Sequence, residues 1–333
     1  MAQHCPKSPS SSSDPLCTFG IIADVQYGDL EEKYNFHKTR LRNYRKSLDL
    51  LERAVTNWTA DGVDCVLQLG DIIDGFNKPQ KASESALSSV IDVLNVFPGP
   101  VYHTWGNHEL CNFTQEELMK SVLFSGSMPQ CACPEGKSYY SFNLHRKLKV
   151  VVLNCYEISM LGLPEDSAEY KQANELILKH NPNKSLCNPD GLDGTRRRFV
   201  KLNGLVSDSQ LEWLKETLQR ATEEQENVII MGHVPICEQS ADGMFLCLNY
   251  TEIMATISTY NTCVLCYFAG HYHEGGSHVD SSGILHVTFA GIIESQEMDA
   301  YATAYLYNDR LVIQGKGSYS SYETKLKFPC NNV

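Results

Sequence analysis

Residues 64–74 read DCVLQLGDIID, an apolar run that stops abruptly at Gly70-Asp71. A short apolar run bounded by turn residues predicts a buried strand, and the Gly-Asp pair predicts a turn directly after it. A helix is expected next, at about 79–96, because the pattern ends before Pro98-Gly99-Pro100. Strands that alternate with helices in this way indicate an α/β fold with a largely parallel sheet.

Four other apolar runs end in the same abrupt way, each at polar residues that can bind a metal ion. They are CTFGIIADVQ (17–26), VYHTWGNHE (101–109), NVIIMGHVP (227–235) and TCVLCYFAGHYH (262–273). In open α/β sheets, ligands bind at the carboxyl ends of the strands. We therefore expect the polar residues at these five strand ends to meet in one site.

Two further helices and one strand pair are predicted between these motifs. Helical spacing of apolar residues extends over about 39–60, and a second helix is expected over 207–221 with Ser207 as its N-cap. KSYYSFNL (137–144) and LKVVVLNC (148–155) are predicted to pair as antiparallel strands, because only a short basic turn separates them.

The rest of the chain outlines one domain. The Ser- and Pro-rich residues 1–15 are expected to form a disordered tail, and 16–330 a single domain. Residues 278–316 alternate and turn like a β-meander. Residues 156–205 are rich in Asn, Pro and Gly, and we interpret them as a long irregular insertion. Insertions of this length are usually functional, so we expect a lid or a pocket wall.

The composition restricts the class of partner. The chain has 333 residues, 42% of them hydrophobic, and a formal net charge of −12, which disfavours nucleic acid and anionic membranes as partners. No run approaches the ~18 apolar residues of a membrane helix, and 1–15 lack the apolar core of a secretion signal. Many of the 13 cysteines lie inside apolar runs, where a free thiol behaves as a small apolar side chain. Because no secretion signal is evident, we expect reduced thiols and a cytoplasmic location. We also expect a monomer.

Seven residues at the strand ends are candidate metal ligands. They are Asp24, Gln26, Asp71, Asn107, His233, His271 and His273. Carboxylate, amide oxygen and imidazole groups bind hard to borderline divalent cations. Each motif alone is weak, since a strand-to-turn junction or a Gly-His dipeptide is common, and the argument depends on all five together.

The motifs follow the chain in the order D-x-Q, G-D-x-x-D, G-N-H-E, G-H-x-P and G-H-x-H, between Cys17 and His273. This order resembles that of the calcineurin-like metallophosphoesterase superfamily. The resemblance implies an α/β fold with four layers, α/β/β/α, in which two mixed sheets are flanked by helices. It also implies two metal ions, which together clamp a phosphoryl group and activate a water molecule.

The resemblance assigns a role to each matched residue. One ion would be held by Asp24, Gln26, Asp71 and His273, and the other by Asp71, Asn107, His233 and His271, with Asp71 bridging the two. His108 would act with Asp71 in catalysis, by stabilising or protonating the leaving oxygen. Asp74 and Glu109 would orient a histidine or a water molecule.

Gln26 departs from the pattern of the superfamily, which usually has histidine at this position. An amide oxygen is a harder and weaker ligand than imidazole. We therefore expect a loosely held first ion, with Mn²⁺ as the metal and Mg²⁺ or Zn²⁺ as alternatives.

Within the superfamily, the chain most resembles the manganese-dependent ADP-ribose/CDP-alcohol diphosphatases. The similarity is carried by FGIIADVQYGDLE, NFHKTRLRNYR, VLQLGDIIDGFN, HTWGNHE, HNPN and FAGHYHEGG. It implies a hydrolase that splits the pyrophosphate bond of ADP-ribose, CDP-choline and related nucleoside diphosphate derivatives. The products would be a nucleoside monophosphate and a phosphorylated sugar or alcohol.

Four residues are candidate contacts for such a nucleotide substrate, which needs apolar surface for the base and a few basic groups. They are Phe36, Arg42, Leu192 and Phe245. Two other functions stay open. One is a phosphomonoesterase or phosphodiesterase of another substrate class on the same fold, and the other is a binding scaffold without catalytic activity.

Overall fold

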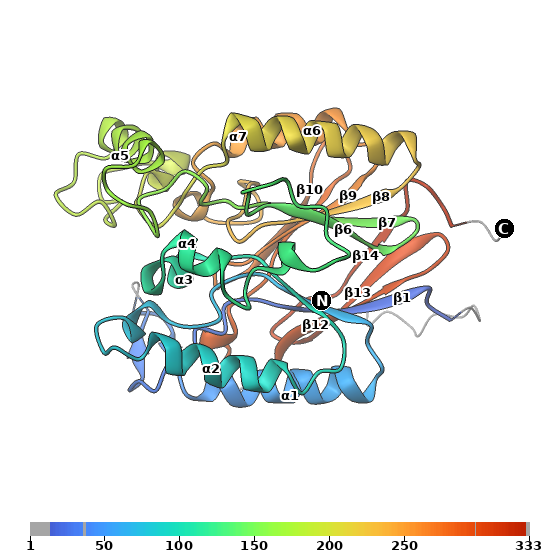
Figure 1. Ribbon diagram of the computed structural model, residues 1–333, viewed down its shortest axis with the longest axis horizontal. Coiled ribbons are helices and arrows are strands. Elements are labelled where there is room, and N and C mark those ends of the chain that lie inside the picture. Colours follow the sequence, from blue (N-terminus) through green and yellow to red (C-terminus); the bar gives the residue numbers. More distant parts are fainter. Residues whose placement is uncertain (1–13, 36–37, 297, 331–333) are drawn as a thin grey trace, which may run out of the picture.

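The computed structural model describes residues 14–35, 38–296 and 298–330. Two six-stranded mixed sheets pack face to face, and helices cover the outer face of each (Figure 1). The expected α/β/β/α arrangement is therefore confirmed. Phe36 and most of the expected tail at 1–15 lie outside the described residues.

The first sheet has the strand order β14-β13-β12-β1-β4-β5. Its strands are β1 (Cys17–Ile22), β4 (Cys65–Gln68), β5 (Val101–His103), β12 (Ala300–Leu306), β13 (Arg310–Gly317) and β14 (Tyr322–Lys325). The first three run parallel, and β12 pairs antiparallel with the other edge of β1. The three motifs that follow β1, β4 and β5 therefore lie at the same edge of this sheet.

The second sheet has the order β10-β11-β9-β8-β7-β6. Its strands are β6 (Tyr140–His145), β7 (Leu148–Val152), β8 (Asn227–Met231), β9 (Val264–Ala269), β10 (Gly276–Val279) and β11 (Leu285–Thr288). The antiparallel pairing predicted for β6 and β7 is confirmed. The predicted meander over 278–316 is wrong, because β11 joins β9 in this sheet while β12 and β13 belong to the first. Alternation of apolar and polar residues indicates a strand but does not specify its neighbour.

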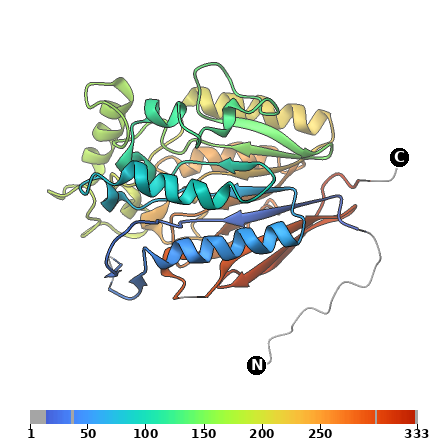
Figure 2. The ribbon, with the colours of Figure 1, turned by 60° about the horizontal axis from the view of Figure 1, so that its bottom comes forward.

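The main helices are α1 (Lys46–Ala60) and α2 (Ser83–Leu94) on the first sheet, and α6 (Asp208–Glu223) and α7 (Tyr250–Thr259) on the second. Figure 2 shows α1 and α2 side by side. The predicted cap of α6 is confirmed, since the Ser207 hydroxyl accepts from the N–H of Gln210 at 3.1 Å. The helix predicted over 39–60 begins later than expected, because residues 41–42 form β3 (Leu41–Arg42) with β2 (Lys33–Tyr34).

The insertion at 156–205 is more regular than expected. It contains α5 (Ala168–His180) and the 3₁₀ helix η3 (Gly194–Arg198). Its apolar side chains form a small core of their own with a residue near η4 (Gly243–Phe245); the members are Ile158, Ala173, Ile177, Phe199, Leu205 and Leu248. Only Ala173 and Ile177 of α5 are buried, and this narrow apolar face explains why the sequence pattern did not reveal the helix.

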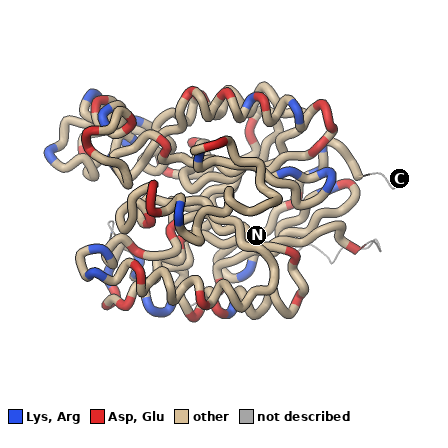
Figure 3. Tube along the Cα trace, in the orientation of Figure 1, with Lys and Arg blue, Asp and Glu red and all other residues tan. Residues whose placement is uncertain are grey.

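The remaining short elements follow motif strands or connect sheets. They are α3 (Asn107–Asn112), α4 (Gln115–Met119), η1 (Gly75–Asn77), η2 (Ser125–Ser127) and η5 (Ile292–Glu294). Along the outer helices, Lys and Arg are interspersed with Asp and Glu (Figure 3). Within the described ranges, no helix combines the length and the apolar character that a bilayer crossing requires.

Trp58 of α1 holds that helix against the first sheet. Its ring is fully buried and lies directly over Gly20 of β1, where a Cβ would come within 2.5 Å of the indole. The indole N–H donates to the hydroxyl of Thr303 on β12 at 3.2 Å, and the ring meets that of Tyr301 edge-on at 5.3 Å. One side chain thus spans the two strands on which the first metal motif depends.

We expect Trp58→Ala to lower the free energy of unfolding by about 3–5 kcal/mol, because it leaves a large cavity over Gly20. Urea unfolding followed by circular dichroism measures this loss. Trp213→Ala is the matched control, since Trp213 lies on α6 and is only partly buried. A loss for Trp58→Ala no greater than that for the control would contradict the role given to Trp58.

Candidate metal centre

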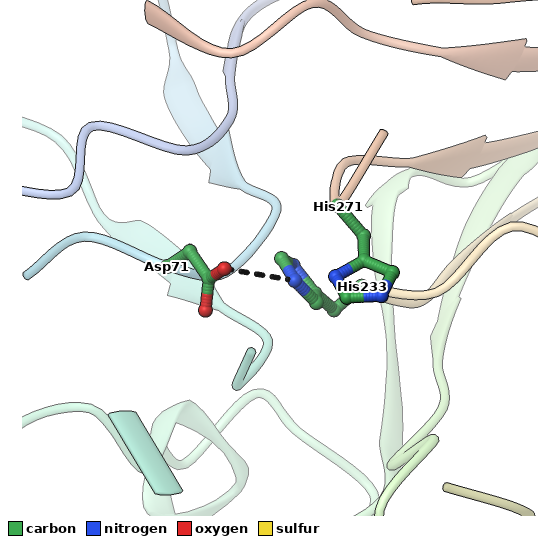
Figure 4. Close-up of side chains that lie close together, drawn as sticks. All are labelled: Asp71, His233 and His271. Atoms are coloured by element: carbon green, nitrogen blue, oxygen red, sulfur yellow. Dashed lines mark ion pairs between the residues drawn. The ribbon is translucent and has the colours of Figure 1, made fainter. Parts of the chain in front are cut away.

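The ends of five strands from both sheets meet at one place, as the sequence predicted. Side chains that follow β1, β4 and β5 face side chains that follow β8 and β9. Figure 4 shows Asp71 from the first sheet opposite His233 and His271 from the second. The potential ligand atoms of these three buried residues all lie within 4.8 Å of one another.

His233 makes the closest connection between the two sheets. Its Nε2 lies 3.2 Å from the Asp71 carboxylate, and its Nδ1 donates to the backbone carbonyl of Leu69 at 2.8 Å. This approach requires glycine at position 70, because a Cβ there would lie 2.4 Å from the His233 ring, and Gly70 also has a φ of +95°. With Nδ1 engaged, Nε2 is the ring nitrogen that can bind a metal.

The second group of predicted ligands surrounds His273. The Nε2 atom of His273 lies 3.3 Å from Asp24 and 2.9 Å from the Gln26 amide nitrogen, which is also 3.2 Å from Asp71. The amide oxygen of Gln26 is buried and has no hydrogen-bond partner among the residues described. A buried oxygen without a partner is costly in a folded protein, and a bound cation would satisfy it.

Asn107 completes the set at the start of α3. It is buried, and its amide oxygen lies 3.4 Å from the hydroxyl of Tyr156, a residue that the motifs did not indicate. The structure therefore brings all seven predicted ligands to one place. Two carboxylates, two amides and three imidazoles fit a divalent cation site.

Four of these residues have a left-handed backbone. The φ angles of Asp24, Gln26, Asp71 and His271 are +52°, +45°, +55° and +66°, whereas only eight non-glycine residues in the described ranges have positive φ. Such conformations are uncommon and persist where the surroundings hold them. Their concentration here indicates that each strand is forced to turn sharply as it delivers its ligand.

Glu109 holds two of these turns in place. Its carboxylate accepts from the N–H groups of Asp71, Ile72 and Gly106, each at 2.7 Å. These partners differ from the histidine or water that we expected. Burial and the nearby Asp71 carboxylate raise the pKa of Glu109 to about 7.

His108 lies beside Asp74, the carboxylate expected to orient a histidine or a water molecule. Its Nδ1 lies 3.2 Å from Asp74 and accepts from the N–H of Gly75 at 2.8 Å, while its Nε2 is 3.9 Å from Asp71. Burial lowers the pKa of His108, but Asp71 and Asp74 outweigh this and raise it above the ordinary value. Because Nδ1 accepts from the Gly75 N–H, Nε2 carries the ring proton and faces the other site residues.

Two polar residues that the sequence did not indicate orient the histidines of the last motif. Nε2 of His271 lies 2.8 Å from the amide oxygen of Asn203, and Nδ1 of His273 lies 2.8 Å from Glu294. Glu294 also accepts from Nε of Arg42 at 2.8 Å. Buried acceptors of this kind commonly orient histidines that bind metals.

The three histidines differ in charge. Burial lowers the pKa of His233 and His273, but nearby carboxylates, Asp71 for the first and Asp24 for the second, raise the values to about 10 and about 9. Burial and the adjacent His233 lower the pKa of His271 well below its ordinary value. A proton on His233 thus balances the Asp71 carboxylate, and a bound cation would take over this function.

A cavity of about 230 Å³ opens beside these residues. Arg42 and Phe245 line it, and Phe245 packs edge-on against His271 at 5.3 Å and lies 5.2 Å from the ring of Tyr272. Leu192 is buried and is not one of the described residues that line the cavity. The fourth candidate, Phe36, lies outside the described ranges.

Comparison with known proteins identifies the family. The family model described as calcineurin-like phosphoesterase matches residues 17–275. The manganese-dependent ADP-ribose/CDP-alcohol diphosphatase of Homo sapiens is 38% identical over 98% of both chains, and that of Danio rerio is 40% identical over 91% of this chain and 96% of its own. A crystal structure of a dimetal phosphatase from Danio rerio superposes with a TM-score of 0.90 and 39% identity, and the match covers 94% of this chain and 100% of that chain. The matched motifs, the converging strand ends and these similarities show that the chain belongs to the calcineurin-like phosphoesterase family.

Proposed function

We propose that this chain is a manganese-dependent hydrolase that cleaves the pyrophosphate bond of ADP-ribose, CDP-choline and related nucleoside diphosphate derivatives. The products are a nucleoside monophosphate and a phosphorylated sugar or alcohol. The observation that carries the proposal is the convergence of all seven candidate ligands around Asp71, beside a cavity lined by Arg42 and Phe245. The names of the relatives that match it over nearly their whole length support this choice of substrate.

The candidate ligands divide into two sets that share Asp71. Asp24, Gln26, Asp71 and His273 would hold one ion, and Asp71, Asn107, His233 and His271 the other. When bound, two divalent ions neutralise charge on the phosphoryl group and lower the pKa of an attacking water. The buried oxygen of Gln26, which has no hydrogen-bond partner in the described part of the chain, supports its assignment as a ligand.

His108 acts on the leaving group in this proposal. Asp74 and the Gly75 N–H hold its Nδ1 edge, so its Nε2 edge is the one that faces the substrate. The N–H at Nε2 donates a hydrogen bond to the oxygen that develops negative charge as the P–O bond breaks, or protonates that oxygen.

Arg42 and Phe245 contact the parts of the substrate away from the reacting phosphorus. The Arg42 side chain lines the cavity and keeps 21% of its surface exposed, while its Nε donates to Glu294 and another of its nitrogens lies 3.4 Å from His273. It provides a positive charge for the second phosphate in a chain whose net charge is −12. The Phe245 ring offers a surface on which a nucleobase stacks.

The proposal extends to location and assembly. The twelve cysteines in the described part of the chain are all free, which supports a reducing compartment such as the cytoplasm. The net negative charge supports small-molecule substrates rather than nucleic acid or membranes. We propose a monomer, because one chain supplies all seven candidate ligands.

The first test is hydrolysis of ADP-ribose and CDP-choline by the metal-free protein, alone and after addition of Mn²⁺ or Mg²⁺. We expect AMP or CMP to be released only with metal, and most rapidly with Mn²⁺, as measured by chromatography of the products. Asp71→Ala should abolish the activity, because both ions lose a shared ligand. Asp280→Ala is the matched control, since Asp280 pairs with His286 at 3.0 Å outside the site.

The outcomes of this assay separate the three functions considered. Cleavage of p-nitrophenyl phosphates with both nucleotide derivatives left intact would retain the family chemistry and overturn the proposed substrate. No turnover of any phosphate ester with any metal would favour a scaffold.

A second prediction concerns the metal ligand that departs from the superfamily pattern. Gln26→His should lower the Mn²⁺ concentration needed for half-maximal activity, because imidazole is a stronger ligand than an amide oxygen. Titration of the metal-free protein with Mn²⁺ measures the change by activity and by calorimetry. An unchanged requirement for Mn²⁺ would show that Gln26 does not bind the ion.

A third prediction concerns the base-binding surface. Phe245→Ala should raise the KM for ADP-ribose about tenfold, since stacking on an aromatic ring contributes ~1–3 kcal/mol per base. The KM for methyl p-nitrophenyl phosphate, which has no nucleobase, should rise less. Tyr307→Ala serves as the control, because Tyr307 lies far from the site. It directly follows Leu306, which pairs with Cys17 at the start of β1, whereas the site lies beyond the other end of that strand. Equal effects on both substrates would contradict a role in base binding.

A further inference from the structure

The carboxamide of Asn203 connects the insertion to a candidate metal ligand. Asn203 is fully buried near the end of the segment 156–205. Its oxygen lies 2.8 Å from Nε2 of His271, and its nitrogen donates to the backbone carbonyls of Arg198 and Met244, each at 2.8 Å. We propose that Asn203 is a positioning residue that fixes the tautomer of His271 and couples the insertion to the metal centre.

The hydrogen-bond pattern determines which way the carboxamide points. Carbonyl oxygens only accept hydrogen bonds. The carbonyl oxygens of Arg198 and Met244 therefore require the NH₂ group of Asn203, and not its oxygen, to face them. The Asn203 oxygen must then face His271, and because it also only accepts, Nε2 of His271 must carry the proton. Nδ1 of His271 is left unprotonated, as a metal ligand must be.

The two carbonyls place this contact within the wall of the cavity. Arg198 ends η3 of the insertion, and Met244 lies in η4 next to Phe245. Leu202, which directly precedes Asn203, lines the same cavity. Asn203 therefore connects three parts of the structure by hydrogen bonds: the candidate metal ligand His271, the cavity wall at η4, and the insertion.

The inference deepens the proposed function and rests on it for the identity of the metal. It is tested by direct binding of Mn²⁺ to the metal-free protein, measured by calorimetry and by the electron paramagnetic resonance signal of free Mn²⁺. Asn203→Leu keeps the approximate size but removes every polar contact. We expect it to weaken the binding of one of the two ions about 10- to 100-fold.

Asn203→Asp separates the two functions of the side chain, because a carboxylate still accepts from His271 but donates nothing to the wall. We expect Mn²⁺ affinity within a few-fold of the wild type, together with a raised KM for ADP-ribose. The matched control is Asn181→Leu. Asn181 is also buried in the insertion, and its amide donates to the carbonyls of Asn188 and Phe199 at 3.1 and 2.8 Å. Its oxygen accepts from the N–H of Asn183 at 3.0 Å, where the oxygen of Asn203 faces a histidine.

Wild-type affinity in Asn203→Leu, or an equal loss in the control, would overturn the proposal. An equal loss of Mn²⁺ affinity in Asn203→Asp and Asn203→Leu would show that the Asn203 oxygen does not position His271. An unchanged KM for ADP-ribose in Asn203→Asp would show that the Asn203 nitrogen does not hold the cavity wall. If Asn203→Leu does not fold, ¹⁵N spectra of the metal-free wild type decide, since the proposal requires the proton of His271 on Nε2 and not on Nδ1. A wild-type protein that binds no Mn²⁺ would instead contradict the proposed function.

Discussion

The rest of the site depends on the contacts by which His233, from the second sheet, binds the first sheet. Its imidazole binds the carbonyl that precedes Gly70 on one side and faces Asp71 on the other, so the carboxyl ends of β4 and β8 cannot separate without breaking both contacts. The absence of a side chain at Gly70 permits this approach. Each sheet alone supplies an incomplete set of candidate ligands, and the contacts of His233 hold the two sets together.

Burying charged groups and turning the backbone sharply at this site costs free energy of folding, and neighbouring residues offset that cost. Four ligand residues have left-handed backbones, and several charged groups are buried. Glu109 compensates on the backbone side by accepting from N–H groups of two separate turns. Glu294 compensates on the side-chain side by accepting from Arg42 and His273. Without bound metal, ion pairs between histidines and carboxylates balance the charge.

The strand ends and the candidate ligands that follow them could be predicted because both signals are local in the sequence. An apolar run marks each strand, and the polar residues follow it directly, as Gly70-Asp71 follow β4. The residues that orient these ligands could not be found in this way. Glu294 and Asn203 lie 21 and 68 positions from their histidines, and no local pattern connects them. The predicted meander over 278–316 failed for the same reason: β11 and β12 belong to different sheets, and strand partners depend on the path of the whole chain.

The position of β1 has a consequence for how the protein is made. This strand lies between β4 and β12, and the residue that follows it, Ala23, donates from its backbone to the hydroxyl of Tyr319, 296 positions later. On the ribosome, one edge of β1 therefore has no native partner until nearly the whole chain has emerged. Such long-range pairing is slow, and an unpaired edge invites association with other chains. Chaperones that shield nascent chains should matter most for this segment.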